Sequence, residues 1–352
     1  MACQVASLSN KLPKEFIAYI FYPALSHKTK AFKFAAICLL SLFILGCIQT
    51  SPHCLSPPKP TGLINAKQLF KDLQTLAHPD MQGRKTNTLG SQKAQQFIQQ
   101  KFEQIGLQAL QNNFRQPFYF GKNNEKGVNL FGKLAGRHKT KKNHLIVISA
   151  HYDHLGQQGT KIYHGSDDNA SGVAALLTIA QFFKTYSTDY SLIFLATDAE
   201  EAGLYGAQAF LNASPIKPKQ ILFNINLDMI SRGGRKNRLY VAGTRFKPVL
   251  KSITMLAAQP TQLCLKPGHQ GRQFSRNSLT APINWDEASD HYIFNKHGID
   301  YLYFGVDLHP DYHQSSDTPE KTNLAFYTAT VETIISTIQR LDKLVLGFNQ
   351  KD

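Results

Sequence analysis

The chain of 352 residues has few cysteines, few charged residues and no apolar run long enough to cross a bilayer. Its five cysteines include no CxxC pair, which argues against a disulfide scaffold and against a thiolate zinc site. Charged residues make up 18%, and the 23 Gly and 16 Pro follow no period, which excludes coiled-coil and collagen-like chains. Hydrophobic residues reach 42%, so the composition is that of a globular protein with a sizeable core.

The net charge is +15, yet no block of five or more basic residues occurs. Basic residues that are spread along a chain do not form the compact patch that binds polyanions. We therefore do not expect nucleic acid as a partner. Because thiolates are scarce, any bound metal must be held by histidine and carboxylate side chains.

The N-terminal region has the pattern of an export signal. Three lysines precede a largely apolar run over residues 34–45, a length typical of a secretory signal and too short for a bilayer span. The run ends at Gly46 and Cys47, which resembles a bacterial lipobox. We predict a signal peptide over residues 1–46, lipidation of Cys47 and a Pro- and Ser-containing tether over residues 47–62. The protein would then be an exported bacterial lipoprotein that faces the periplasm or the cell exterior, with an uncleaved signal anchor as the alternative.

From about residue 63 onward, helical and strand patterns alternate as they do in βα units. The runs 145–150, 191–197 and 221–227 are too continuously apolar for a one-sided sheet, and they suit strands with helices on both faces. Helices are expected at residues 66–73, 90–105, 172–186, 207–211, 248–258 and 324–346. We predict one α/β/α domain over residues 63–352 with a central mixed, mostly parallel sheet. Residues 264–285 are polar and without periodicity, and a loop of that length is usually functional.

Polar residues follow these predicted strands. His151 and Asp153 come directly after the first, and side chains two apart on extended backbone point the same way. The Asp153 carboxylate can therefore accept the second ring N–H of His151 while the other ring nitrogen binds a metal. An isolated histidine and aspartate at this spacing are usually only a structural polar contact.

Further acidic residues stand where ligands gather in open α/β sheets, beyond the carboxyl ends of strands. Asp167 and Asp168 precede a helix, where acids usually serve as caps, and Glu200 and Glu201 follow the second strand. Asp228 ends the third strand, where burial of an unpaired charge would be costly. His313 lies near the C-terminus, after an apolar run over residues 301–304. Each acidic pair alone is more often an exposed turn, and only the combination is informative.

Together these residues provide two histidines and three carboxylates as ligands, with one glutamate to spare. Imidazole and carboxylate donors without thiolate suit two Zn²⁺ ions in a co-catalytic site. Zinc lowers the pKa of a bound water to about 7, and a glutamate can then carry the proton to a leaving amine.

The motifs resemble peptidase family M28, the aminopeptidase and glutamate-carboxypeptidase group. The resemblance runs from about residue 63 to the end. It comprises residues 82–84 (QGR), 151–156 (HYDHLG), 166–172 (SDDNASG), 200–203 (EEAG), 226–229 (NLDM), 289–291 (SDH) and 309–321 (HPDYHQSSDTPEK).

This resemblance implies a role for each matched residue. One zinc ion would be held by His151 and Asp228, the other by Glu201 and His313, with Asp168 bridging the two. Glu200 would be the general base and acid. The family also places a cis peptide after the bridging aspartate.

Some relatives use an aromatic hydroxyl before the SDH segment to hold the oxyanion. Here Trp285, Asp286, Glu287 and Ala288 precede Ser289, so the resemblance leaves the donor unassigned. Asp290 is expected in the surroundings of the ligands, and Asp286 and Glu287 are candidates for a substrate's α-amine, although a solvated turn is the commoner outcome. The other histidines, His154 and His309 among them, carry no sign of being ligands.

We therefore predict an exported, membrane-tethered di-zinc aminopeptidase acting on peptides. Alternatives are a carboxypeptidase or dipeptidase that holds a terminal carboxylate with Arg232 or Arg272, a single-zinc enzyme like glutaminyl cyclase, and a catalytically inactive receptor-like domain.

Overall fold

A computed structural model describes residues 54, 56–110, 112–243, 248–273 and 282–344. The predicted signal peptide and Cys47 lie outside these residues. No helix within the described ranges combines the length and the apolar character that a bilayer crossing requires.

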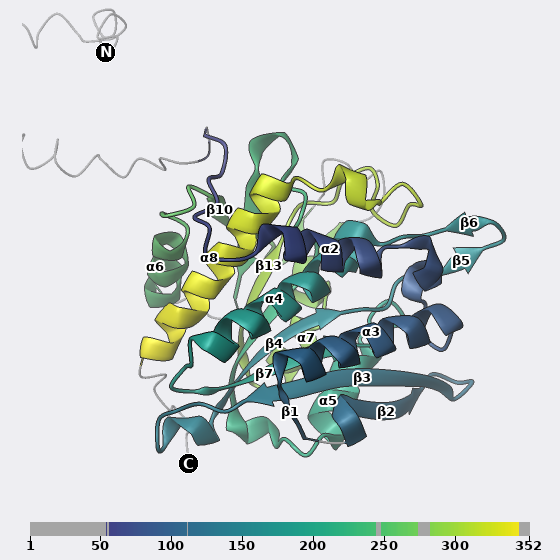
Figure 1. The fold of residues 1–352 in the computed structure, drawn as a ribbon, viewed down its shortest axis with the longest axis horizontal. Coiled ribbons are helices and arrows are strands. Elements are labelled where there is room, and N and C mark those ends of the chain that lie inside the picture. Colours follow the sequence, from purple (N-terminus) through teal and green to yellow (C-terminus); the bar gives the residue numbers. More distant parts are fainter. Residues whose placement is uncertain (1–53, 55, 111, 244–247, 274–281, 345–352) are drawn as a thin grey trace, which may run out of the picture. The chain divides into compact units, whose positions relative to one another are not determined.

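A mixed sheet of nine strands forms the centre of the described chain, in the order β1-β3-β7-β4-β8-β13-β9-β10, with β2 also paired to β3 (Figure 1). The strands are β1 (Gln108–Ala109), β2 (Arg115–Phe120), β3 (Glu125–Leu134), β4 (Leu145–His151), β7 (Ser191–Thr197), β8 (Ile221–Leu227), β9 (Arg238–Ala242), β10 (Cys264–Pro267) and β13 (Asp300–Gly305). The four middle strands, β7, β4, β8 and β13, are parallel. Strands β1, β2 and β3 join antiparallel, so the predicted mixed sheet is confirmed, with its parallel part at the centre.

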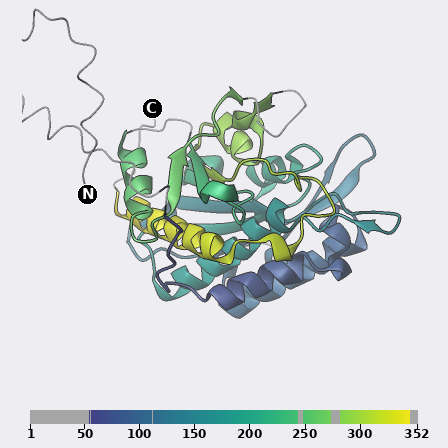
Figure 2. The same cartoon turned by 90° about the horizontal axis from the view of Figure 1, so that it is seen from above.

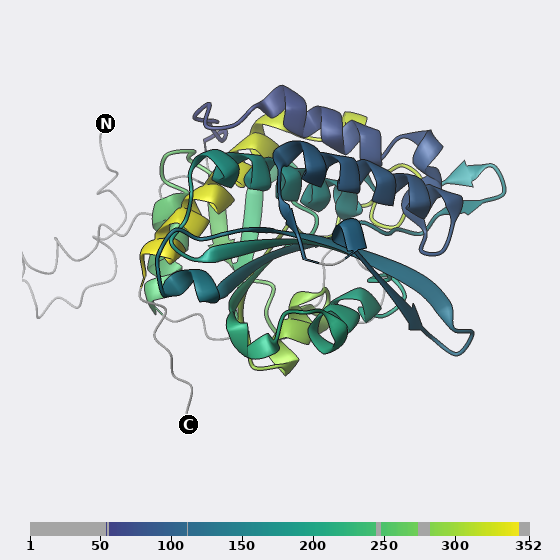
Figure 3. The ribbon, with the colours of Figure 1, turned by 60° about the horizontal axis from the view of Figure 1, so that its bottom comes forward.

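Helices cover both faces of the sheet. They are α2 (Ala66–Leu76), α3 (Leu89–Ile105), α4 (Gly172–Thr185), α5 (Tyr205–Ala213), α6 (Pro248–Ala257), α7 (His291–Lys296) and α8 (Leu324–Lys343). Along β4, Ile146 and Ile148 pack into the core under α2, α3, α4 and α8, whereas Leu145 and Val147 pack under α5 and α7. Figures 2 and 3 show these two helix layers on opposite sides of the sheet. Burial on both faces explains why Leu145–Ile148 are apolar at four successive positions.

Residues 264–285 contain more regular structure than the sequence indicates. β10 extends the sheet parallel to β9, and β11 (Arg272–Gln273) pairs with β12 (Ile283–Asn284) as a short antiparallel ladder. A second small ladder joins β5 (Gln157–Gln158) and β6 (Lys161–Ile162). These pieces are too short to produce a periodic pattern.

The segment from Cys54 to Leu63 is bound to the domain. A disulfide joins Cys54 to Cys264, and the Glu332 carboxylate on α8 accepts hydrogen bonds from the backbone amides of Thr61 and Leu63, at 2.6 and 2.9 Å. The sequence allowed this disulfide but gave no support for it. The part of the predicted tether from Cys54 onward is therefore fixed to the folded domain.

Candidate active site and metal centre

The parallel strands bring the predicted ligands to one edge of the sheet. β4 ends at His151, and β8 ends one residue before Asp228. Glu201 follows β7, and His313 lies in the loop between β13 and α8. Asp168 comes from the turn Ser166–Ser171, which leads into α4. Because carboxyl ends of parallel strands share an edge, side chains from distant parts of the chain meet there.

The Asp168 carboxylate lies between two pairs of side chains. Its Oδ1 is 3.4 Å from His151 Nε2, which is itself 3.4 Å from Asp228 Oδ1. Its Oδ2 is 3.1 Å from His313 Nε2, which is 3.3 Å from Glu201 Oε2. We call His151 and Asp228 the strand half of the site, and Glu201 and His313 the loop half. One carboxylate thus faces both halves with a different oxygen.

The donors fit a pair of divalent cations. Two clusters of possible ligand atoms, each within 4.8 Å, lie here, one of His151, Glu200 and Asp228 and one of His154, Asp168 and Glu201. Asp228 Oδ1 is buried and makes no hydrogen bond among the described residues. Several carboxylates packed this tightly repel one another unless cations lie between them. Imidazole and carboxylate donors without thiolate suit zinc.

The charges of the ligands are strongly coupled. Burial favours the neutral form of Asp168, but hydrogen bonds with His151 and His313 hold its pKa well below the usual range. Burial opposes the charged form of His313, yet its contacts with Asp168 and Glu201 raise its pKa to about 10. The side chains therefore behave as an ionised, mutually stabilising group.

Burial raises the pKa of the Glu200 carboxyl well above the ordinary value, and burial also raises the pKa of Asp228. His151 opposes the shift at Glu200, while Asp228 and Glu201 add to it. The side chain lines the same cavity as His151 and Asp228. A carboxyl group whose pKa is raised takes up a proton more readily than an ordinary carboxylate, which suits a general acid and base.

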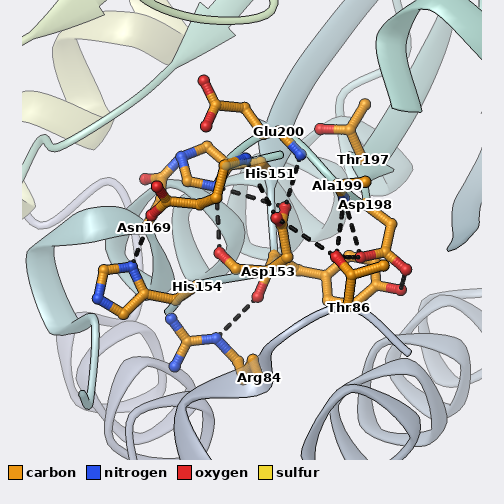
Figure 4. A network of polar contacts seen from close by, with 12 residues as sticks. Arg84, Thr86, His151, Asp153, His154, Asn169, Thr197, Asp198, Ala199 and Glu200 are labelled. Carbon is orange, nitrogen blue, oxygen red and sulfur yellow. Dashed lines mark hydrogen bonds and ion pairs between the residues drawn. The ribbon is translucent and has the colours of Figure 1, made fainter. Parts of the chain in front are cut away.

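Asp153 supports the site in a different way from the predicted one. His151 Nδ1 is 3.2 Å from the backbone carbonyl oxygen of Asp153 and 3.7 Å from its Oδ1, so the carbonyl is the nearer acceptor. The carboxylate instead accepts hydrogen bonds from the backbone amides of Glu200 and Glu201, at 3.1 and 3.2 Å (Figure 4). Asp153 thus links the end of β4 to the turn that carries both glutamates.

Two buried side chains next to the site, Arg84 and Asp198, hold these segments in place through hydrogen bonds. The Arg84 guanidinium, labelled in Figure 4, donates to the backbone carbonyl of Tyr152 at 2.8 Å. It also donates to the backbone carbonyls of Gly165, at 2.8 Å, and of Leu76 and His164. It therefore joins the His151 segment to the Asp168 segment. The carboxylate of Asp198 accepts hydrogen bonds from the hydroxyls of Thr86 and Tyr152, at 2.6 and 2.7 Å. The QGR segment signalled Arg84, but its contacts could not be read from the sequence.

The turn that holds Asp168 is fixed by side chains from elsewhere in the chain. The Asp317 carboxylate accepts hydrogen bonds from the backbone amides of Asp167 and Asp168. The Asn169 amide donates to Leu227 O at 2.9 Å, beside Asp228. The peptide bond between Asp168 and Asn169 is cis, as the family resemblance implied.

A cavity of about 200 Å³ opens over the two halves of the site. Its lining comprises His151, Asp168, Glu200, Glu201, Asp228, Met229, Ile283, Trp285, Ala288, Tyr303, Leu308, Tyr312 and His313. The charged groups on this wall are the ligands and Glu200, and the other side chains are apolar or aromatic. Trp285 is stacked on His269, with ring centroids 3.7 Å apart. His269 lies in the loop between β10 and β11, as expected, but it is buried.

Tyr303 lines this cavity, although the sequence did not single it out. Burial, followed by the charge of Asp228, raises the pKa of Tyr303 well above its usual value, so the phenol stays protonated. Its hydroxyl makes no hydrogen bond to another described residue. Gly305 leaves room for it, because a Cβ there would lie 2.4 Å from the hydroxyl and 2.8 Å from the Asp228 carbonyl oxygen. Tyr303 follows Ser289 in the chain, so a search before the SDH segment does not find it.

Other predicted contributors lie elsewhere. Asp286 and Glu287 do not line the cavity. Arg232 is committed to two acids, with its guanidinium 2.7 Å from Asp311 and 3.5 Å from Asp317. Arg272 lies on β11 and is exposed. Asp290 is buried and receives a hydrogen bond from the Thr197 hydroxyl, as expected for a residue that surrounds the ligands.

The sequence resembles known peptidases. A comparison with protein families matches the description "Peptidase family M28" over residues 129–338. One curated relative is the alkaline phosphatase isozyme conversion protein of Escherichia coli K12, 29% identical over 66% of this chain and 66% of its own length. Another is aminopeptidase YwaD of Bacillus subtilis 168, 27% identical over 50% of this chain and 36% of its own length. The alignments thus span less than two thirds of these relatives.

Solved structures share the fold. A zinc aminopeptidase from Bacillus subtilis superimposes with a TM-score of 0.63 at 16% identity, covering 79% of this chain and 95% of that one. A glutaminyl cyclase from Fimbriiglobus ruber gives a TM-score of 0.63 at 19% identity, covering 80% of this chain and 97% of the other. At these identities the similarity concerns the fold alone.

Proposed function

Since the chain belongs to peptidase family M28 and is a metallopeptidase, we propose that it is an exported aminopeptidase with two zinc ions. Its substrates are peptides with a free N-terminus and an apolar first residue. The observation that carries the proposal is the Asp168 carboxylate, which faces His151 with one oxygen and His313 with the other.

His151 and Asp228 would hold one zinc ion, Glu201 and His313 the other, and Asp168 would bridge them. When bound, zinc polarises the peptide carbonyl and makes an attacking water more acidic. Glu200 receives the proton of that water on its carboxylate and delivers it to the leaving amine. The backbone amides of Glu200 and Glu201 are both held by Asp153, which keeps the base and the ligand in fixed relation.

Tyr303 supplies the hydrogen bond that the carbonyl oxygen gains as it becomes an oxyanion. The phenol is buried beside Asp228, is kept protonated and has no partner among the described residues that would compete. A preorganised donor of this kind stabilises developing charge because it need not reorient during the reaction.

The choice of the N-terminus over the C-terminus follows from the lack of a free cationic side chain in the described lining of the cavity. Four carboxylates line it, those of Asp168, Glu200, Glu201 and Asp228. Two zinc ions would balance these four charges, so a terminal carboxylate would still need a basic side chain to hold it. Arg232, which could have bound a terminal carboxylate, is neutralised by Asp311 and Asp317. This distribution favours an aminopeptidase over a carboxypeptidase.

The apolar part of the cavity lining favours an apolar first residue. Met229, Ile283, Trp285 and Leu308 belong to it. The indole is held rigidly, because it stacks on the His269 ring, which in turn stacks on Tyr240. The ring centroids of His269 and Tyr240 are 4.3 Å apart. Transfer of a large apolar side chain onto such a surface contributes roughly 1.5–3 kcal/mol.

Export is supported by the disulfide between Cys54 and Cys264, because disulfides persist in oxidising compartments. The signal peptide over residues 1–46 and the lipidation of Cys47 remain predictions. Mass measurement of the mature N-terminus tests them, since cleavage before a diacylated Cys47 would distinguish a lipoprotein from an uncleaved anchor.

A single-zinc glutaminyl cyclase is the second candidate, because a solved cyclase shares the fold. Zinc analysis of the purified protein, combined with incubation on an unblocked peptide library and mass analysis of the products, decides between the two. Two ions per chain and release of apolar N-terminal residues support the peptidase. One ion and conversion of N-terminal glutamine to pyroglutamate would support the cyclase instead.

A further inference from the structure

His154 lies beneath the loop half of the site and touches one of its ligands. Its side chain is fully buried, and Nδ1 is 2.8 Å from Glu201 Oε1. The other oxygen of that carboxylate, Oε2, is 3.3 Å from His313 Nε2. Glu201 therefore lies between two imidazoles, each next to a different carboxylate oxygen.

The hydrogen-bond chemistry defines the direction of this contact. An ionised carboxylate only accepts hydrogen bonds, so Nδ1 of His154 must carry the hydrogen. Nε2 is buried and has no hydrogen-bond partner among the described residues.

His154 shares a cluster of possible ligand atoms with Asp168 and Glu201, and its Nδ1 is 3.8 Å from Asp168 Oδ2, so its place relative to the cavity is what separates a supporting role from that of a ligand. His151 and His313 both line the cavity, whereas His154 does not. Gly165 provides the space for the ring, since a Cβ at that residue would lie 2.6 Å from it. The Gly165 carbonyl is in turn held by Arg84 at 2.8 Å, which fixes the residue next to the ring.

We propose that His154 is a positioning residue for the loop half of the zinc site, which rests on the proposed two-zinc function. By donating from Nδ1 to Oε1 of Glu201, it fixes the rotation of the carboxylate and leaves Oε2 to face the metal beside His313. The strand half needs no such partner, because the Asp153 carbonyl already orients His151.

Zinc binding at buffered free-zinc concentrations tests this role. Four variants are compared with the wild type: His154→Ala, His154→Asn, His154→Gln and, as matched control, His164→Ala. The asparagine amide can stand where Nδ1 stands, whereas the glutamine amide reaches one methylene further. His164 lies just before the turn that holds Asp168, and its Nδ1 is 2.9 Å from the Ala77 carbonyl oxygen.

The expected result is weaker binding of one of the two zinc ions. His154→Ala and His154→Gln lower the zinc affinity of the loop half by about 10- to 100-fold and leave the zinc affinity of the strand half unchanged. His154→Asn stays close to the wild type, and so does His164→Ala. Co²⁺ substitution provides a second readout, since the visible spectrum of the loop-half ion changes in His154→Ala and is restored in His154→Asn.

Two results would overturn the proposal. Unchanged zinc binding in His154→Ala and His154→Gln would mean that Glu201 needs no support. An equal loss in His154→Asn and His154→Ala would make the imidazole itself a ligand. If His154→Ala does not fold, the comparison of Asn with Gln still decides. A wild type that binds one ion refutes the two-zinc function, whereas the Asn and Gln variants still report on His154 at that ion.

Discussion

The two halves of the metal site share Asp168 but are built in different ways. In the strand half, His151 ends β4 and Asp228 follows β8, and their side chains are 2% and 10% exposed. Adjacent parallel strands fix the spacing of these two residues through backbone hydrogen bonds. This half is part of the sheet edge itself.

In the loop half, the ligands depend on contacts made by other side chains. His313 is 34% exposed and lies in a loop with a left-handed backbone, φ 55°. Its loop is joined to the domain through Asp311 and Asp317, and Glu201 is joined to it through Asp153 and His154. Substitutions of the surrounding residues should therefore weaken zinc binding at the loop half and leave zinc binding at the strand half largely unchanged.

The largest expected effect on zinc content and activity comes from replacing Asp168, the residue that both halves share. Asp168→Ala removes the bridging carboxylate, so bound zinc falls from two ions toward none and peptide hydrolysis falls below detection. Metal analysis and an aminoacyl substrate assay measure this. Asp167→Asn is the matched control, because the Asp167 carboxylate accepts hydrogen bonds from Ser231 and faces no ligand. A fully zinc-loaded Asp168→Ala protein would contradict the shared-bridge arrangement.

Glu200 and Glu201 are neighbours with different predicted roles, and exchanging each for alanine separates them. Glu200→Ala should lower kcat by about 10²- to 10⁴-fold while both zinc ions stay bound, because a proton carrier is lost. Glu201→Ala should lose the loop-half ion. Kinetics and zinc content are measured on the same preparations. Loss of zinc from Glu200→Ala would instead make Glu200 a ligand of the strand half.

Tyr303 lies next to the strand half of the site, beside Asp228. Tyr303→Phe should lower kcat by about 10²- to 10³-fold with little change in KM, since the donor acts mainly when the oxyanion forms. The control is Tyr301→Phe, two residues earlier on β13 and outside the cavity lining. If both variants keep full activity, another group stabilises the oxyanion.

Much of the fold can be predicted from the sequence because buried parallel strands are continuously apolar. The predicted strands 145–150, 191–197 and 221–227 match β4, β7 and β8 within one residue. The antiparallel strands β2 and β3 were not predicted. Gln116 and Asn129 are polar yet buried, because they bond to each other across the pair. Such pairing cannot be read from either strand alone.

The ligand set was predictable because each ligand ends or follows a recognisable strand. The supporting residues were not, since their roles depend on contacts between distant segments. His154 looks like any other histidine until the fold brings Glu201 to it, 47 residues away. The acceptor for His151 is a backbone carbonyl, which no residue type reveals. Cys54 and Cys264 are 210 residues apart, so neither neighbourhood signals their disulfide.

The smallest expected effect concerns the attachment of the His313 loop. Arg232 pairs with Asp311 at 2.7 Å, and both side chains are about 15% exposed, so the pair is worth about 1 kcal/mol. If that energy holds the loop in place, Arg232→Leu should speed zinc release from the loop half by about fivefold. The strand-half ion should leave at the wild-type rate. Transfer of zinc from the holoenzyme to a chromophoric chelator resolves the two phases.

The matched control for this last variant is Arg235→Leu, because Arg235 lies three residues further along, is exposed and forms no ion pair among the described residues. Equal acceleration in both variants would point to a general effect of removing a positive charge. Acceleration of both zinc ions by Arg232→Leu would mean that the loop also holds the strand half, and the two halves would then not be independent. If Arg232→Leu speeds zinc release from the loop half alone, the loop holds one zinc ion and the sheet edge holds the other independently.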